Sequence, residues 1–370
     1  MTLPRQISLI LSDPRGQTPH SLGKVALSRL VPGSDAPLTP QSVTEGFTAW
    51  TGQPATVQRW EIDASGRLVL LVLECSAGMS GREAPALAPS RLPWEQPGWI
   101  IARKSELSQR IGPLACITQI RHGPLGAVLR IETDARETFW YKETLPLFAA
   151  ETAALRWLNT RQPKRAPRLV AELAYGHLTA DLPRTNASPS QPWWHDLNTI
   201  HIDSIGGTLP VPRLTPGMLS KRLSGLVPTE TCALPDTQRL LRALDALDTL
   251  PGSEVLIHGD LHPENAIPTE QGWALVDWTD CALAHPLLDL ALIPRYWPQD
   301  FVPALAHLAT QWDLPQTPKG LPLHEVATAA GVARLLHQYA LIHDATDPRY
   351  RHWAGHRITD WLGWLASRPL

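Results

Sequence analysis

Acidic and amide side chains in one short stretch are the residues of this 370-residue chain best suited to chemistry. Asp260 lies in the segment HGDLHPEN, Asn265 follows five residues later, and Asp277 ends the apolar run WALV. Phosphoryl transfer uses this combination, because one carboxylate holds the attacking hydroxyl while an amide and a second carboxylate hold magnesium. The spacing predicts that Asp260 orients or deprotonates the acceptor and that Asn265 and Asp277 bind Mg²⁺.

The competing interpretation is an ordinary strand-to-loop turn, in which the His, Asp and Asn side chains only cap local structure. The occurrence of all three polar residues, with an apolar run at this distance, favours phosphoryl transfer. The runs Val255–Ile257 before the loop and Ala274–Asp277 after it are short and apolar, which predicts two strands that hold the loop between them.

Helical periodicity dominates the chain after about residue 190. Leucines recur at helical spacing over Asp236–Thr249. Further helices are predicted over 287–293, 302–310, 324–343 and 356–366. The earlier part predicts strands at 57–62, 68–74, 116–121, 128–132, 138–142, 168–174 and 177–182, helices at 100–110 and 148–159, and a short helix or strand at 42–51.

This order of elements predicts an α+β fold, with a β-rich lobe that contains one helix followed by a helical lobe. Residues 76–99 are rich in Pro, Gly and Ser and mark a boundary. We therefore predict a small α/β N-terminal domain at 1–85, a linker at 86–111, a β-rich lobe at 112–182 and a helical lobe at 183–370.

Composition bounds the class of protein. Hydrophobic residues make up 43% of the chain and the formal charge is −2, so neither nucleic acid nor a membrane surface is an expected partner. The four cysteines lack the spacing of zinc sites or disulfide frameworks, which predicts small core thiols in a reducing compartment. No apolar stretch reaches the roughly 18 residues of a spanning helix. We therefore expect a cytoplasmic protein.

The segments HGDLHPENAI and ALVDWTDCALAHPLLDLA together resemble the aminoglycoside phosphotransferase and choline kinase branch of the protein-kinase-like superfamily. Gly259 and His262 stand where protein kinases have Arg and Lys, and Trp278 replaces the Phe-Gly that follows their metal-binding Asp. The resemblance covers about residues 112–366. It implies a bilobal kinase-like fold, ATP as donor, Mg²⁺ as metal and a small-molecule hydroxyl as acceptor.

Nucleotide-binding residues are assigned through this resemblance. Lys142 ends the strand FWYK and matches the lysine that contacts the α- and β-phosphates, while Glu151 in the next helix matches its acidic partner. Glu143 is the rival of Glu151, but its place next to Lys142 in a strand points it to the opposite face. Residues 123–126 lack the GxGxxG of protein kinases, so we expect only a β-turn near the triphosphate. Adenine is expected near 177–182.

Other polar residues receive supporting roles. Asp289 matches the buried acid that braces the catalytic loop from the next helix, and His258 is expected to hold the geometry of the loop. His262 either faces the γ-phosphate or packs against its neighbours. Asp344 or Asp347 either binds a cationic acceptor or belongs to a solvated helix end.

The segment LPWEQPGW resembles a linker in bacterial members whose front domain is loosely Nudix-like. The Nudix catalytic helix motif is missing, so we expect residues 1–85 to bind or pack. The leading hypothesis is a small-molecule kinase. The alternative is a catalytically weak, nucleotide-binding pseudokinase or regulatory module, suggested by the poor glycine turn and the extra domain. The complete set of Asp260, Asn265 and Asp277 favours the enzyme, but kinases of many acceptors share these residues.

Overall fold

The computed structural model describes residues 6–12, 20–26, 30, 39–62, 68–75, 82–83, 92–226, 234–252, 254–345 and 351–368. The chain forms two compact units. The first comprises Met1–Leu145, Val170–Thr179 and Ala345–Trp353, and the second comprises Pro146–Leu169, Ala180–Asp344 and Ala354–Leu370. The four-part division expected from the sequence stays a prediction. Within the described ranges, no helix combines the length and apolar character needed to cross a bilayer.

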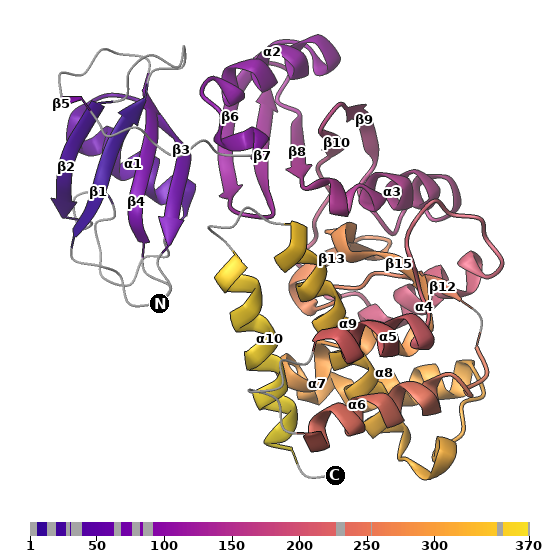
Figure 1. Ribbon diagram of the computed structural model, residues 1–370. Coiled ribbons are helices and arrows are strands. Elements are labelled where there is room, and N and C mark those ends of the chain that lie inside the picture. Colours follow the sequence, from indigo (N-terminus) through magenta and orange to yellow (C-terminus); the bar gives the residue numbers. More distant parts are fainter. Residues whose placement is uncertain are drawn as a thin grey trace. The chain divides into compact units, whose positions relative to one another are not determined.

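The first unit opens with a five-stranded sheet of order β3-β4-β1-β2-β5 (Figure 1). Its strands are β1 (Gln6–Ser12), β2 (His20–Ala26), β3 (Ala55–Ile62), β4 (Leu68–Cys75) and β5 (Arg82–Glu83). The helix α1 (Pro40–Thr51) buries Val43 and Phe47 in the core of this sheet. It starts at the capping side chain of Thr39 and ends at Gly52, whose φ of 71° suits a helix end. The segment expected as a helix or a strand is thus a helix.

A second five-stranded sheet, of order β6-β7-β8-β10-β9, follows the helix α2 (Trp99–Ile111). Its strands are β6 (Leu114–His122), β7 (Gly126–Thr133), β8 (Thr138–Thr144), β9 (Leu169–Leu173) and β10 (Gly176–Ala180). The predicted strands at 116–121, 128–132 and 138–142 therefore exist, and they pair antiparallel in chain order. Cys75 and Cys281 are buried as expected, whereas Cys116 is exposed, which corrects the expectation of a core thiol there. Cys232 lies outside the described residues.

Helices and short strands make up most of the second unit. The helices are α3 (Ala150–Arg161), α4 (Trp193–Ser204), α5 (Pro216–Leu226), α6 (Leu234–Leu247), α7 (Ile293–Tyr296), α8 (Pro298–Gln311), α9 (Leu323–Ala345) and α10 (Arg351–Ala366). The strands are β11 (Arg213–Leu214), β12 (Val255–Ile257), β13 (Ala266–Thr269), β14 (Gly272–Leu275) and β15 (Ala282–Ala284). A single hydrophobic cluster joins the helices to β12 and β15. The α+β class expected from the sequence is confirmed.

The helix predicted over 287–293 was wrong in its form. A 3₁₀ helix over Pro286–Leu290 is followed by the separate short helix α7. Pro294 explains the break, because it lacks the N–H that a continuous helix would direct to the carbonyl of Leu290.

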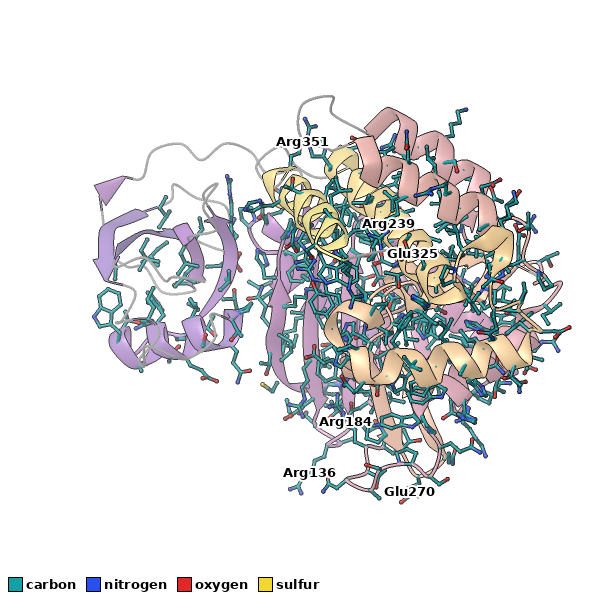
Figure 2. All side chains as sticks on the ribbon, turned by 90° about the horizontal axis from the view of Figure 1, so that it is seen from below. Arg136, Arg184, Arg239, Glu270, Glu325 and Arg351 are labelled. Carbon is teal, nitrogen blue, oxygen red and sulfur yellow. The ribbon has the colours of Figure 1, made fainter. Side chains whose placement is uncertain are left out.

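A buried ion pair joins three helices of the second unit. Arg239 of α6 binds Glu325 of α9 through two contacts, one of them 2.8 Å between Nη2 and Oε2. Arg239 Nη1 also donates to the carbonyls of Leu365, at the end of α10, and of Arg368 just beyond it. Figure 2 labels both members of the pair where they meet. The pair therefore links α6, α9 and the end of α10.

Candidate active site

The candidate loop leaves the fully buried strand β12 through a glycine that no other residue could replace without movement. Gly259 has φ of 84°, a conformation that L side chains rarely adopt. A Cβ atom there would lie 2.0 Å from the carbonyl oxygen of Asp280, so backbone passes directly against backbone. This turn brings the loop that carries Asp260 against the segment that follows Asp277.

Asp289 holds this turn from the 3₁₀ helix Pro286–Leu290. Its Oδ2 accepts the N–H of His258 at 3.0 Å, and its Oδ1 accepts the N–H of Gly259 at 2.7 Å. His201 of α4 donates from Nε2 to Oδ2 at 2.8 Å. Burial alone would raise the pKa of Asp289, but these donors lower the pKa below its ordinary value. The buried carboxylate therefore stays ionised and binds the loop.

His258 has a structural position rather than a reactive one. Its Nδ1 accepts the N–H of Asp260 at 3.3 Å, so Nε2 carries the proton and donates to the carbonyl of Val276 at 2.8 Å. The ring also packs on Trp278, with the ring centres 4.6 Å apart. Burial lowers the pKa of His258, which keeps the imidazole neutral and both hydrogen bonds intact.

Asn265 and Asp277 are brought together by short-range backbone and side-chain bonds. Asn265 donates from Nδ2 to the carbonyl of Asp260 at 2.9 Å, and its own carbonyl accepts the N–H of Val276 at 2.9 Å. Asp277 has φ of 64° and ψ of 61°, an uncommon conformation for a residue other than glycine. Strained backbone of this kind is common at functional sites. The three predicted residues therefore meet in one loop cluster.

Thr279 links this cluster to Glu151, and sequence reasoning missed it. Its hydroxyl lies 3.1 Å from Glu151 Oε2 and is also hydrogen-bonded to Asp277 Oδ1. One hydroxyl proton is shared between two carboxylates, which holds both near each other. Glu151 is buried in α3, at 3% exposure. The available sequence signal for this link was the position of Thr279, two residues after Asp277.

The donor atoms suit magnesium. Asn265 uses its amide NH₂ within the protein, which makes its carbonyl oxygen the atom that could face a cation. Asp277 contributes carboxylate oxygen, and both are hard donors. Within the described part of the chain, no group of three or more His, Cys, Asp or Glu side chains could hold a metal alone.

Asp260 lies beside a stacked pair of rings. Its Oδ2 lies 3.9 Å from Nε2 of His262, whose ring stacks on Trp297 with centres 5.2 Å apart and planes 4° apart. Burial lowers the pKa of His262, although Glu264 and Asp277 oppose the shift. The stacking on Trp297 supports the hypothesis that His262 packs against its neighbours.

The helix α9 supports the loop with two side chains that sequence reasoning did not single out. Arg334 is fully buried and donates from Nη2 to the carbonyl of Gly259. One turn later, Gln338 donates to Asp280 Oδ1 at 2.6 Å. These contacts span 75 and 58 residues of sequence, so local patterns contain no sign of them.

Lys142 lies in β8 of the first unit, opposite Val128 of β7. The adjacent Glu143 is fully buried on the other face of the strand, where its Oε2 accepts from Trp99 Nε1 at 2.9 Å and from Tyr141 Oη at 2.6 Å. The Glu143 carboxylate therefore faces α2 and is hydrogen-bonded there. The pairing of Lys142 with Glu151 stays a prediction.

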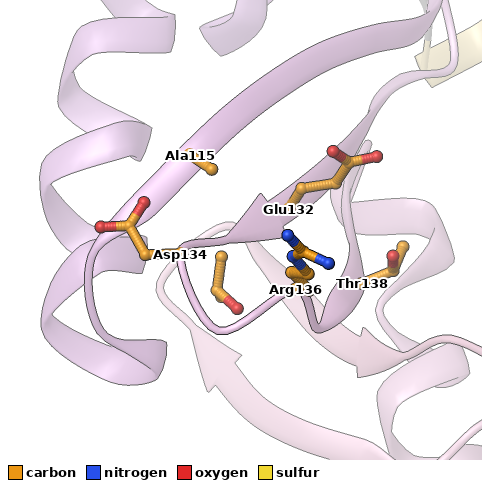
Figure 3. A pocket seen from close by; sticks show the side chains of 6 residues that line it. Ala115, Glu132, Asp134, Arg136 and Thr138 are labelled. Carbon is orange, nitrogen blue, oxygen red and sulfur yellow. The ribbon is translucent and has the colours of Figure 1, made fainter.

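Two further features involve no residue of the loop. A pocket of about 640 Å³ is lined by Ala115, Glu132, Thr133, Asp134, Arg136 and Thr138, none of them a predicted site residue (Figure 3). Asp344 forms an ion pair with Arg222 of α5, so its charge is already neutralised within the protein. Asp347, the other candidate for a cationic acceptor, lies outside the described residues.

The loop cluster can be compared with known proteins. Residues 211–324, which include the loop, match the model of a family described as "Phosphotransferase enzyme family". The matched segment contains the same loop that carries the resemblance seen in the sequence. No curated protein matches the chain.

Solved structures show the same relationship at the level of fold. A macrolide 2'-phosphotransferase type I is 18% identical, with a TM-score of 0.50, and the match covers 70% of this chain and 96% of that one. A putative fructosamine-3-kinase from Thermobifida fusca is 18% identical over 72% and 98% of the two chains, with a TM-score of 0.44. A choline kinase from Streptococcus pneumoniae is 14% identical over 71% and 99%, with a TM-score of 0.48.

Proposed function

We propose that the chain is an ATP- and Mg²⁺-dependent phosphotransferase that acts on a hydroxyl group of a small molecule. The observation that carries the proposal is the loop cluster of Asp260, Asn265 and Asp277, which Asp289 and His258 hold in place. A pseudokinase is the weaker alternative, because every polar group that the reaction needs in this loop is present.

In this proposal, Asp260 orients the acceptor hydroxyl and accepts its proton as the new O–P bond forms. The bond between the γ-phosphorus and the bridging oxygen breaks at the same time, and ADP leaves with that oxygen. Asn265 and Asp277 would hold magnesium, which when bound neutralises charge on the phosphates. Lys142 would contact the α- and β-phosphates, and Glu151 would orient Lys142.

Two substitutions test the assignment. Asp260→Ala should keep Mg·ATP affinity within about threefold while turnover of any working acceptor falls by about 10³-fold or more, because only positioning of the hydroxyl is lost. Asp277→Ala should weaken Mg·ATP binding about tenfold or more in calorimetry. Asp245→Ala, at an exposed carboxylate on α6, is the control and should change neither quantity.

The outcomes separate the two hypotheses. Turnover with a screened set of hydroxyl compounds that survives Asp260→Ala would remove Asp260 from the mechanism. The pseudokinase would be supported instead if the protein binds Mg·ATP in a manner that depends on Asp277 but shows neither acceptor turnover nor slow ATP hydrolysis.

A further inference from the structure

Aromatic side chains extend from the Asp260 carboxylate toward α7. Asp260 lies beside His262, and His262 stacks on Trp297. The Trp297 ring in turn lies 5.7 Å from the ring of Tyr296, the last residue of α7. Tyr296 is 40% exposed, so part of its ring faces solvent.

The helices α9 and α10 contribute two more side chains to this group. The guanidinium of Arg357, on α10, lies 5.6 Å from the centre of the Tyr339 ring of α9 and interacts with the hydroxyls of Tyr339 and Tyr296. Burial raises the pKa of Tyr339, and the negative charge of Asp260 contributes to the same shift. We call the resulting set the acceptor ring; its members are Asp260, His262, Trp297, Tyr296, Arg357 and Tyr339.

Arginines outnumber carboxylates at the α10 side of the acceptor ring. Asp360 serves two guanidinium groups: its Oδ1 lies 3.0 Å from Arg295 Nη2, and its Oδ2 lies 3.7 Å from Arg357 Nη1. Arg295 is held further by Trp361, whose ring centre is 4.7 Å from its Cζ. Arg357 Nε is a buried donor with no hydrogen-bond acceptor among the described residues. Arg295 and Arg357 therefore share one carboxylate among the described residues, and one of the two positive charges has no carboxylate of its own.

We propose that the acceptor carries a carboxylate or phosphate group as well as the reacting hydroxyl, and that Arg357 binds this anionic group. The proposal rests on the phosphotransferase function proposed above. Guanidinium groups bind both kinds of anion through parallel hydrogen bonds. The rings of Tyr296 and Trp297 then pack against the carbon skeleton and direct the hydroxyl to Asp260.

The same charges oppose a cationic acceptor. An amino sugar or an amino alcohol in the acceptor ring would face Arg357 at like charge, and the aromatic face of Tyr339 is already occupied by that guanidinium. Arg357 is thus a specificity-determining residue, distinct from the phosphate-transferring loop.

Matched acceptors that differ in one group provide the test. The first series is glycerol, glycerate, glycerol 3-phosphate and 3-amino-1,2-propanediol; the second is glucose, gluconate, glucose 6-phosphate and glucosamine. We expect an anionic member to exceed its neutral and amino counterparts at least tenfold in kcat/KM. The comparison within each series shows whether carboxylate or phosphate is preferred.

Substitutions then assign the effect to Arg357. Arg357→Gln should raise KM for the anionic acceptor about tenfold or more and leave kcat and the KM for Mg·ATP within threefold. Arg357→Lys should lie between this variant and the wild type, because it keeps the charge but loses the fork of donors. Arg368→Gln, which alters an arginine that stacks on Trp364, is the control and should change none of these constants.

Preference for a neutral or amino acceptor, or an unchanged KM in Arg357→Gln with wild-type thermal stability, overturns the proposal. So does turnover of no anionic member by a wild type that binds Mg·ATP, and in that case the phosphotransferase function still stands. A wild type that binds no Mg·ATP in calorimetry overturns both.

Discussion

The polar residues of the candidate catalytic loop hold one another in place. Asp289 accepts two backbone N–H groups and one imidazole N–H, and His258 bridges the backbone of Asp260 and Val276. Groups held in this way need little reorganisation when charge develops in a transition state. The loop is therefore preorganised by residues that do not themselves touch a substrate in the proposed mechanism.

Thr279 offers a test at the scale of one hydroxyl. Thr279→Val should weaken Mg·ATP binding by about tenfold, or about 1.4 kcal/mol, because Glu151 and Asp277 lose their shared donor. Thr279→Ser keeps the hydroxyl and should bind within threefold of the wild type. Calorimetric affinities that are equal in the Val and Ser variants would show that the hydroxyl bridge has no part in nucleotide binding.

At the scale of elements, α9 connects the catalytic loop to the rest of the helical core. Arg334 and Gln338 reach the loop from one part of the helix, and Glu325 binds α6 and α10 through Arg239 near its start. Gly331, between them, lets α9 approach the backbone of Ala291 so closely that a Cβ atom would lie 2.8 Å from its Cα. Close packing, rather than periodicity, sets the position of this helix.

The pair of Arg239 and Glu325 provides the prediction for these elements. Arg239→Ala should lower the free energy of unfolding by about 3–5 kcal/mol, because it leaves the buried Glu325 carboxylate without a counter-charge. Urea denaturation measures this change. Lys319→Ala removes an exposed ion pair with Asp245 and should cost less than about 1 kcal/mol. Equal losses in the two variants would mean that burial adds nothing to the cost.

At the scale of the whole molecule, a buried histidine predicts sensitivity to acid. Burial lowers the pKa of His285 to about 4, while the unfolded chain has the ordinary value near 6.5. The unfolded state therefore binds a proton between these two values and the folded state does not, so stability falls as the pH drops from 6.5 to 4. The full effect is on the order of 3 kcal/mol.

His285→Gln removes this proton uptake. The melting temperature of the variant should fall less between pH 7 and pH 4.5 than that of the wild type. His343→Gln, at an exposed side chain of α9, is the control and should follow the wild type. Parallel acid profiles for all three proteins would exclude His285 as a source of the sensitivity.

Elements whose stability is local were the ones that the sequence predicted. The strands β6, β7 and β8 pair with their neighbours in the chain, so alternation and turn residues were enough to find them. The helix α4 was missed, because it has no strong amphipathic pattern. Its buried residues include Trp193, Leu197 and Ile200, which belong to the hydrophobic cluster of the second unit. Burial on several sides erases the periodicity on which such predictions depend.

By itself, the sequence brought the polar residues of the loop close together. Asp260, Asn265 and Asp277 lie within 18 residues, and the bonds between Asn265 and the Asp260 backbone and between Thr279 and Asp277 span only a few residues. Only the tertiary structure decided what surrounds that loop. Asp289 and Arg334 reach it across 30 and 75 residues, because the packing of buried elements places them there. Residue spacing encodes contacts within a loop, whereas contacts between helices depend on how complete side-chain surfaces fit together.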